Sequence, residues 1–127
     1  MSTYHFTIGG KDYTGETASA KEQFQALHLA TNSRLILCIK EDMSEKAVVL
    51  GVMSMSWSDL QTLEKLLVKD KVVRDSDEVP VGPNLFRDNP AGYALLVGKA
   101  AQANLSAFYQ LSGGKNADAG ELNQAEM

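Results

Sequence analysis

Two histidines, His5 and His28, are the side chains best suited to acid–base chemistry, because an unperturbed imidazole titrates at about pH 6.5. His5 lies on the polar face of a predicted strand, and His28 lies within a predicted helix. Metal binding would require further ligands, yet the sequence contains neither a cysteine–histidine cluster nor a His-x-x-x-His pair. We therefore interpret both as ordinary surface or half-buried histidines and predict no metal site.

The single cysteine, Cys38, is the other residue whose side chain could react. A reactive thiol needs an electropositive, partly exposed setting that lowers its pKa. Cys38 lies between Leu37 and Ile39, and burial among aliphatic side chains acts in the opposite direction. We expect a structural role for this thiol, and without a second cysteine no intrachain disulfide can form.

The densest acidic cluster is Asp-Ser-Asp-Glu at residues 75–78, which could attract calcium. A helix–loop–helix calcium site needs glycine at its sixth position and glutamate at its twelfth. Counted from Asp75, these positions hold Pro80 and Phe86, so we interpret the cluster as a solvated turn. No glycine-rich phosphate loop occurs. With no two complementary catalytic groups to pair, the residues predict a non-catalytic protein without a cofactor.

The chain has 127 residues, a length that suits one domain, which we place at residues 1–114. Its formal charge is −4. With 12 Lys and Arg against 16 Asp and Glu, the charge balance predicts no nucleic-acid partner. No segment approaches the ~20 apolar residues of a membrane span, so no membrane contact is predicted. No basic stretch followed by an apolar run opens the chain, and we expect a soluble cytoplasmic protein.

The elements that must position these residues begin with a β-hairpin. Residues 4–8 and 11–14 alternate apolar and polar side chains, and Gly9-Gly10 suits a two-residue turn between them. Two strands alone are marginally stable in water, so the hairpin must pack against another element.

Ser19 and Glu22 have the spacing of a capping box, which predicts a helix start. The predicted helix begins near Ala20, and its inward face comprises Ala20, Phe24, Leu27 and Thr31, with Ala30 beside them.

Residues 33–55 are harder to assign, because a short apolar run cannot be typed by periodicity alone. Residues 35–39 are either a buried strand after a stop at Asn32 or a continuation of the first helix to about Lys40. We favour a helix with a break near Asn32. Residues 47–55 are apolar without a clear period, and we predict a short buried helix there, although Gly51 disfavours it by about 1 kcal/mol.

A leucine-rich helix is predicted next. Ser56 or Ser58 caps it, leucines recur at positions 60, 63, 66 and 67, and it ends at residues 68–70. With Ser58 as the N-cap, Trp57 directly precedes it and is placed to act as a hydrophobic staple. Valines at positions 72, 73 and 79 predict two very short strands that flank the acidic turn.

The last helix is predicted to be the longest element and the spine of the fold. Asp88-Asn89-Pro90 marks its start and Gly113-Gly114 its end. Its small residues permit close helix packing, and one face carries Tyr93, Val97, Ala100, Asn104, Phe108 and Leu111. Residues 115–127 lack periodicity and are predicted to be a disordered tail. The expected fold is α+β, predominantly α-helical, with an N-terminal β-hairpin packed on a small bundle of three to four helices.

An aromatic residue on each arm of the hairpin (Phe6 and Tyr13) precedes the Ser19-Ala20-Lys21-Glu22 helix start. A Leu-rich helix and a short Val/Pro segment follow, and the last helix ends with the Asn-Leu-x-x-Phe of residues 104–108. Over residues 4–112, this order resembles the tail assembly chaperones of long-tailed bacteriophages.

The resemblance implies a non-catalytic phage or prophage protein that acts in the cytoplasm of the bacterial host. Members of this family coat the long helical tape-measure protein, help to recruit the tail-tube protein, and are absent from the finished particle. A helix-in-groove surface would cover the apolar stripes of the tape-measure helix, and copies could form a homo-oligomer along it. Two alternatives stay open: a structural tail-completion or connector subunit, and a small regulatory protein that binds a host protein.

The candidate partner-binding residues are Leu85, Phe86, Asn104, Phe108 and Tyr109. Leu85 and Phe86 lie in a loop between prolines, and we favour their folding back over the core. Asn104 falls on an apolar face, where we favour a hydrogen bond to the hairpin backbone over a partner contact. For Phe108 and Tyr109 we favour a place in the core and at its rim over a binding site.

Overall fold

A glycine turn brings the first two strands together. In the computed structural model, which describes residues 2–40 and 42–112, Gly9 and Gly10 have φ angles of +59° and +79°. These left-handed angles favour glycine, which has no Cβ to clash. The turn allows β1 (Thr3–Ile8) to pair antiparallel with β2 (Lys11–Glu16), as predicted.

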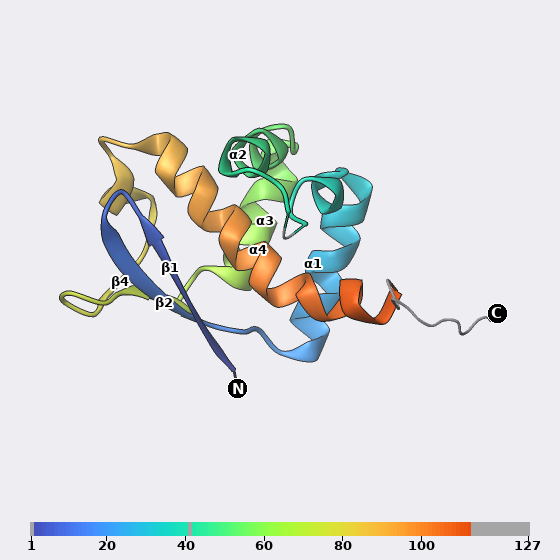
Figure 1. The fold of residues 1–127 in the computed structure, drawn as a ribbon, viewed down its shortest axis with the longest axis horizontal. Helices are drawn as coiled ribbons and strands as arrows, with labels where there is room; N and C mark the ends of the chain where they lie inside the picture. The colour runs from blue at the N-terminus through green and yellow to red at the C-terminus, as the bar shows by residue number, and fades with distance from the viewer. Residues whose placement is uncertain (1, 41, 113–127) are drawn as a thin grey trace.

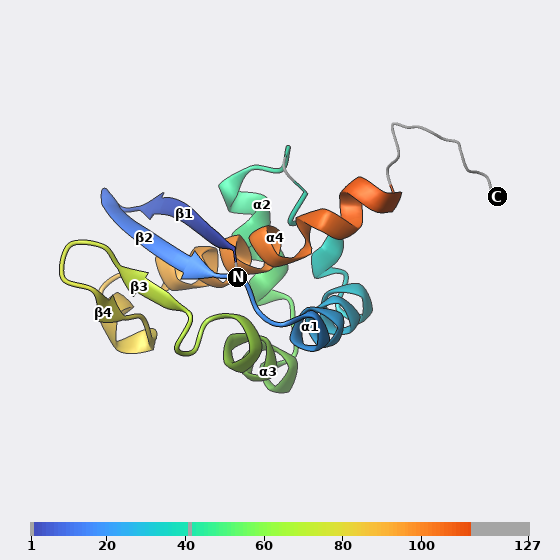
Figure 2. The same cartoon turned by 90° about the horizontal axis from the view of Figure 1, so that it is seen from below.

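Two shorter strands complete the sheet. β3 (Val72–Arg74) pairs with β2, and β4 (Val79–Pro80) pairs with β3, which gives an antiparallel sheet of order β1-β2-β3-β4. Residues 75–78 form the turn between β3 and β4, where Arg74 Nη2 lies 2.6 Å from Asp77 Oδ2. Figure 2 shows the sheet on one side of the molecule and the helices α1 and α3 on the other.

The first helix, α1 (Ala20–Asn32), has the predicted capping box. Ser19 Oγ accepts a hydrogen bond from the Glu22 N–H at 3.2 Å, and Glu22 Oε1 accepts one from the Ser19 N–H at 3.1 Å. Two N–H groups that no helical carbonyl could reach are thereby satisfied.

The inward face of α1 differs from the predicted one. Ala26 and Ala30 are its buried residues, whereas Ala20 and Thr31 are exposed and Phe24 is 55% exposed. The apolar residues of this helix fit two overlapping faces, and the neighbouring elements decide which of them turns inward.

The segment after α1 forms neither a strand nor a continuous helix. Arg34 has a left-handed φ of 67°, which an α-helix cannot include, and a 3₁₀ turn, η1 (Leu35–Leu37), follows it. The predicted break near Asn32 is therefore confirmed. The predicted short helix is present as α2 (Glu45–Met53), but it is buried on one side only, which corrects the expectation of a buried helix.

The third helix, α3 (Trp57–Leu67), has Ser56 as its N-cap. Trp57 is therefore the first residue of the helix, and its side chain is 71% exposed. The prediction that Trp57 acts as a hydrophobic staple in front of Ser58 is wrong, because Ser56 caps the helix two residues earlier.

The last helix, α4 (Pro90–Ser112), is the longest element and crosses the middle of the molecule (Figure 1). A second 3₁₀ turn, η2 (Pro83–Phe86), leads into it, and Asn89 Oδ1 accepts a hydrogen bond from the Gly92 N–H at 3.1 Å. The helix contacts α1, α2, α3, β1 and η2, and most residues from 94 to 101 are buried. The prediction that this helix is the spine of the fold is confirmed.

Gly98 sets how closely α2 approaches α4. A Cβ atom added to Gly98 would lie 2.2 Å from Val48 Cγ1, closer than real side chains approach, and would be tightly placed at 3.3 Å from Val52 Cγ2. The absence of a side chain at this position therefore lets the two helices pack directly.

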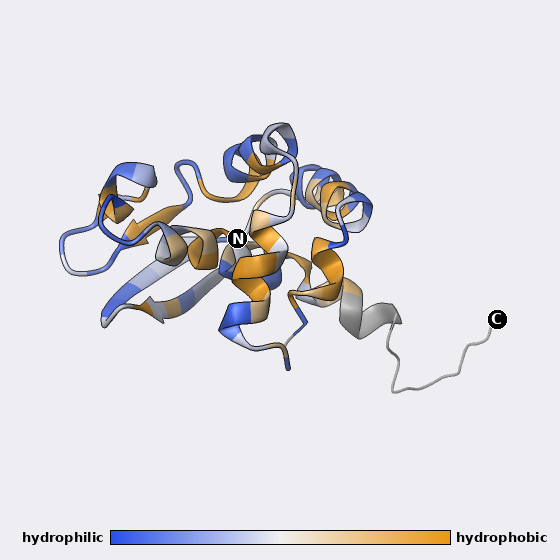
Figure 3. Cartoon of the chain, turned by 90° about the horizontal axis from the view of Figure 1, so that it is seen from above, coloured by the Kyte–Doolittle hydropathy of each residue, from blue (hydrophilic) through white to orange (hydrophobic). Residues whose placement is uncertain are grey.

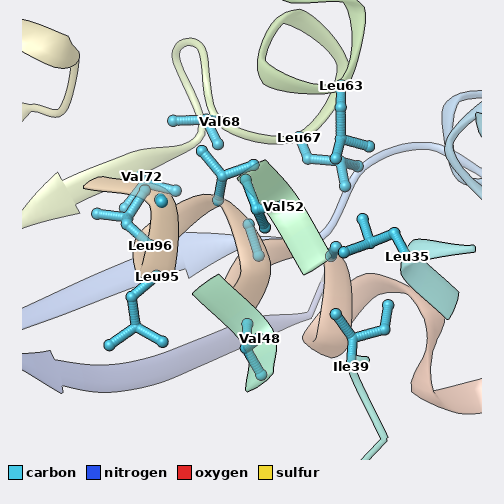
Figure 4. Close-up of a cluster of buried hydrophobic side chains, with 14 of the residues drawn as sticks. Leu35, Ile39, Val48, Val52, Leu63, Leu67, Val68, Val72, Leu95 and Leu96 are labelled. Carbon is cyan, nitrogen blue, oxygen red and sulfur yellow. The ribbon is translucent and has the colours of Figure 1, made fainter. Parts of the chain in front are cut away.

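The core forms where α4 meets the other helices and the sheet. Its largest fully buried side chains come from η1, from α3 and α4, and from Ile39, two residues after η1. They are Leu35, Ile39, Leu63, Leu67 and Leu96, which Figure 4 labels, and Leu105. The fold is α+β and predominantly helical, as predicted. In the described parts of the chain no helix has both the length and the apolar character to cross a membrane. The predicted disordered tail at 115–127 lies outside the described residues.

Candidate partner-binding surface

Three large apolar side chains project from the fold where α2 meets α3. Leu50 is 60% exposed, Met53 is 61% exposed and Trp57 is 71% exposed. Leu50 and Met53 lie about one helical turn apart on α2, and Trp57 follows the short link at residues 54–56. Figure 3 colours most of α2 as hydrophobic. We call these three residues the Trp57 surface, because a group of neighbouring exposed apolar side chains requires a reason that a single one does not.

A hollow of about 240 Å³ adjoins the Trp57 surface, and we call it the Trp57 groove. The end of α2 and the start of α3 form one wall, and the N-terminal half of α4 forms the other. Its principal lining residues are Met53, Trp57, Leu60, Glu64, Tyr93 and Val97. Among the described residues that line it, Glu64 is the one that carries a charge.

A second hollow of about 300 Å³ continues along α3 beyond Glu64 and Tyr93, which line both hollows. Lys65 and Lys69 line the second hollow and not the first. Neither lysine forms a salt bridge within the described chain. Along α3, apolar side chains near its start are thus followed by the Glu64 carboxylate and the Lys65 ammonium group, and Lys69 lies just past the end of the helix.

Tyr93 and Glu64 join the two walls of the Trp57 groove. The Tyr93 hydroxyl donates a hydrogen bond to Glu64 Oε2. Burial, assisted by this hydrogen bond and by the negative charge of Glu64, raises the pKa of the Tyr93 phenol above its usual range. Tyr93 therefore keeps its proton well above neutral pH and remains a donor to the carboxylate.

An aromatic row connects the hairpin to Tyr93. The ring centroids of Tyr4 and Phe6 are 5.9 Å apart, and those of Phe6 and Tyr13 are 5.5 Å apart. Phe86 continues the row at 5.8 Å from Tyr13 and 5.7 Å from Tyr93. These separations are typical of favourable ring contacts. The sheet thus supports the α4 wall of the Trp57 groove from behind.

Two of the predicted partner-binding residues, Leu85 and Phe86, turn toward the core. Phe86 is 6% exposed and stacks on Tyr13, and Leu85 is half-buried against the core. This placement agrees with the favoured interpretation that both fold back over the core. They contribute little surface that a partner could reach.

The amide of Asn104 is used inside the fold. Its side chain is 2% exposed, and Oδ1 accepts a hydrogen bond from the Ala18 N–H at 2.7 Å. Nδ2 donates to the Ala100 carbonyl at 2.8 Å. Asn104 therefore fixes α4 to the backbone, as favoured, although the bond reaches the link between β2 and α1 rather than a hairpin strand.

Phe108 lies between α4 and α1. It is half-buried and makes an edge-on contact with the exposed Phe24, with ring centroids 6.2 Å apart. These two rings form a smaller aromatic surface that shares no residue with the Trp57 groove. The side chain of Tyr109 lies outside the described residues, so a contact there stays a prediction.

His5, Thr14 and Asp75 are linked on the sheet, with Thr14 between the other two. His5 Nδ1 lies 2.9 Å from Thr14 Oγ1, and the Thr14 hydroxyl donates to Asp75 Oδ1 at 2.7 Å. A nucleophilic hydroxyl must instead give its proton to the histidine. Within residues 2–40 and 42–112, no group of His, Cys, Asp and Glu could hold a metal ion.

Cys38 is half-buried rather than fully buried, which corrects the expected burial of the thiol. It follows η1 and packs against α2, where a Cβ atom added to Gly51 would lie 2.5 Å from Cys38 Cβ. This packing is consistent with a structural role for the side chain. His28 is exposed on α1.

Sequence reasoning does not find the Trp57 groove. The available signal is the spacing of Leu50, Met53 and Trp57, which places large apolar side chains along one side of a helix, a turn and a helix. That signal is ambiguous, because α2 is apolar on every side and such a helix is usually buried.

Comparison of this chain with protein-family models, with curated proteins and with solved structures finds no match in any of the three.

Proposed function

We propose that this chain is a non-catalytic binding protein that covers the apolar stripe of an amphipathic helix, and that its partner is the tape-measure protein of a phage or prophage tail. The observation that carries the proposal is the Trp57 surface, whose three side chains are at least 60% exposed beside an apolar groove. The resemblance in element order supplies the identity of the partner.

The spacing of the three exposed side chains suits the binding of a helix. A helix that lies in a groove uses apolar anchors at positions i, i+3 or i+4, and i+7. Leu50, Met53 and Trp57 would meet such anchors, and full burial of one large apolar side chain contributes about 1.5–3 kcal/mol. A single copy therefore binds weakly after the cost of association, and many copies along one long helix hold it by multivalency.

In this role the protein acts in the cytoplasm of the bacterial host, before the tail is complete. Coating keeps the tape-measure helix from aggregating through its apolar stripes, and the coated helix then recruits the tail-tube protein. Copies that lie side by side on the helix can also form a homo-oligomer.

Co-expression with a tape-measure protein tests the proposal, and the one to use is a long helical protein whose gene lies beside the gene for this chain. We expect that protein to stay in the soluble fraction with the wild-type chain and to precipitate with Trp57→Ser. Because Trp57 is 71% exposed, the substitution should leave the fold intact, which circular dichroism checks. Equal solubility of the long protein with and without this chain would contradict the proposal.

Phe24→Ser is the matched control, because Phe24 is also an exposed aromatic residue but lies beside Phe108 rather than at the groove. It should leave the long protein soluble. Loss of solubility with Phe24→Ser alone would move the binding site to the Phe108 region. Purified particles separate the alternatives, since a structural tail subunit is present in them and a chaperone is absent.

A further inference from the structure

Glu64 is placed where any occupant of the Trp57 groove must cover it. It is half-buried in the middle of α3 and lines the hollows on both sides of its contact with Tyr93. One hydrogen bond, from the Tyr93 hydroxyl, reaches its carboxylate in the described structure. A carboxylate offers about four acceptor positions, so most of its capacity is met by solvent while the groove is empty.

Covering the groove would remove that solvent. Removing water from an ionised carboxylate is strongly unfavourable unless the carboxylate gains a cation or several hydrogen-bond donors. Lys65 and Lys69 are exposed and share the second hollow with Glu64, but neither forms a salt bridge with it in the described structure, and neither lines the Trp57 groove. A cation that pairs with Glu64 inside the Trp57 groove would therefore come from the occupant.

We propose that the occupant of the Trp57 groove is an amphipathic helix with a lysine or arginine within one turn of its anchoring apolar residue, and that this cation pairs with Glu64. The inference rests on the proposed function, because it specifies the chemistry of the helix that the groove binds. The apolar groove selects the anchor, and the single carboxylate sets the register of the helix over it.

A displayed library of helical peptides of about 18 residues, roughly five turns, provides the probe. The apolar stripe and its flanking positions are randomised, and the library is selected on the full-length wild-type chain. Peptides that need the groove are those whose binding is lost with Trp57→Ser. We expect these peptides to carry Lys or Arg within one turn of a large apolar residue.

The pairing itself is tested by a double-mutant cycle measured by calorimetry. Glu64→Gln keeps an acceptor for Tyr93 and removes the charge. It should weaken binding of the basic peptide about tenfold or more. A second peptide, identical except that Gln replaces the Lys or Arg, should change in affinity by less than about twofold. Glu16→Gln removes a charge from an exposed residue of β2 and should change neither affinity.

The outcomes separate the inference from the proposed function. Groove-dependent peptides without a basic residue, or a cycle without coupling, overturn the pairing and leave the groove as a docking site. Failure to enrich any Trp57-dependent peptide overturns both. If sedimentation shows a dimer that Trp57→Ser dissociates, the occupant of the groove is a second copy of the chain. If Leu122→Ser raises the affinity for the peptide, the occupant is the segment at residues 113–127. Either result overturns the inference.

Discussion

The two sides of α2 are similarly apolar but have opposite surroundings. On the inner side, Val48 is 3% exposed and Val52 is fully buried, at the point where the absence of a side chain at Gly98 lets α2 pack closely against α4. On the outer side, Leu50 and Met53 are 60% and 61% exposed. The core therefore covers only one side of this apolar helix, and the outer side is available for a partner.

The largest expected effect separates a buried leucine from an exposed one. Leu63→Ala on α3 removes a fully buried side chain and should lower the free energy of unfolding by about 2–5 kcal/mol. Leu50→Ala removes the same atoms from the outer side of α2 and should change it by less than about 0.5 kcal/mol. Urea unfolding of both variants measures the difference. A loss of several kcal/mol from Leu50→Ala would place Leu50 in the core and contradict the comparison.

Asn104→Ala should have the next largest effect. It leaves the Ala18 N–H without its acceptor in a buried position, and we expect a loss of about 1–3 kcal/mol in the free energy of unfolding. Hydrogen exchange provides a local measurement, because the Ala18 amide should lose its protection in the variant. An unchanged exchange rate at Ala18 would show that this hydrogen bond does not hold α4 to the link between β2 and α1.

The helix contact at Gly98 can be tested with a matched pair of glycines. Gly98→Ala places a methyl group against Val48 and should destabilise the fold by about 1–2 kcal/mol, after the better helix propensity of alanine is included. Gly82→Ala meets no atom within 4 Å and should be neutral or slightly stabilising. Thermal unfolding compares the two. Equal midpoints would mean that α2 can move away from α4 without cost.

A buried hydroxyl gives the smallest expected effect. The Tyr4 hydroxyl is buried without a hydrogen-bond partner in the described structure, so Tyr4→Phe should stabilise the fold by up to about 1 kcal/mol at neutral pH. Tyr93→Phe is the control, because it removes a hydroxyl bonded to Glu64 and should destabilise the fold by about 1 kcal/mol.

Tyr4 also makes the stability of the fold depend on pH. Burial raises the pKa of Tyr4 to about 12 from 10.0, so the folded state holds this proton more tightly than the unfolded chain. The resulting stability is complete below pH 10 and is lost as the pH rises from 10 toward 12. Urea unfolding over this range should show a shallower decline for Tyr4→Phe than for the wild-type chain, and parallel curves would contradict the assignment.

Local signals predict much of this fold. The Ser19 and Glu22 capping box, the Gly9-Gly10 turn and the Asn89-Pro90 helix start each depend on a few neighbouring residues, and all three are present. The break after Asn32 could also be predicted. The structure of the segment that follows could not, because the left-handed conformation of Arg34 excludes both a strand and a continued helix, and arginine as a residue type gives no sign of it.

The candidate surface could not be predicted in the same way. Two serines compete for the N-cap of α3, and the choice of Ser56 over Ser58 turns Trp57 from a staple into an exposed first residue. Burial of Leu50 depends on whether a neighbouring element covers the outer side of α2, which is a property of the whole fold. Phe86 is a candidate for partner contact for which sequence reasoning favours packing over the core, and it is buried. Its position in a loop gives no sign that its ring stacks on Tyr13 in the aromatic row.

The aromatic row has a practical consequence for spectroscopy. Its tyrosines and phenylalanines are buried or half-buried and packed against one another, whereas Trp57, the single tryptophan of the chain, is 71% exposed and lines the groove. Tyrosine bands in near-ultraviolet circular dichroism therefore report whether tertiary packing is intact. Tryptophan emission reports whether the groove is occupied. The two signals can be recorded on one sample without a label, so unfolding and binding can be followed separately in a single titration.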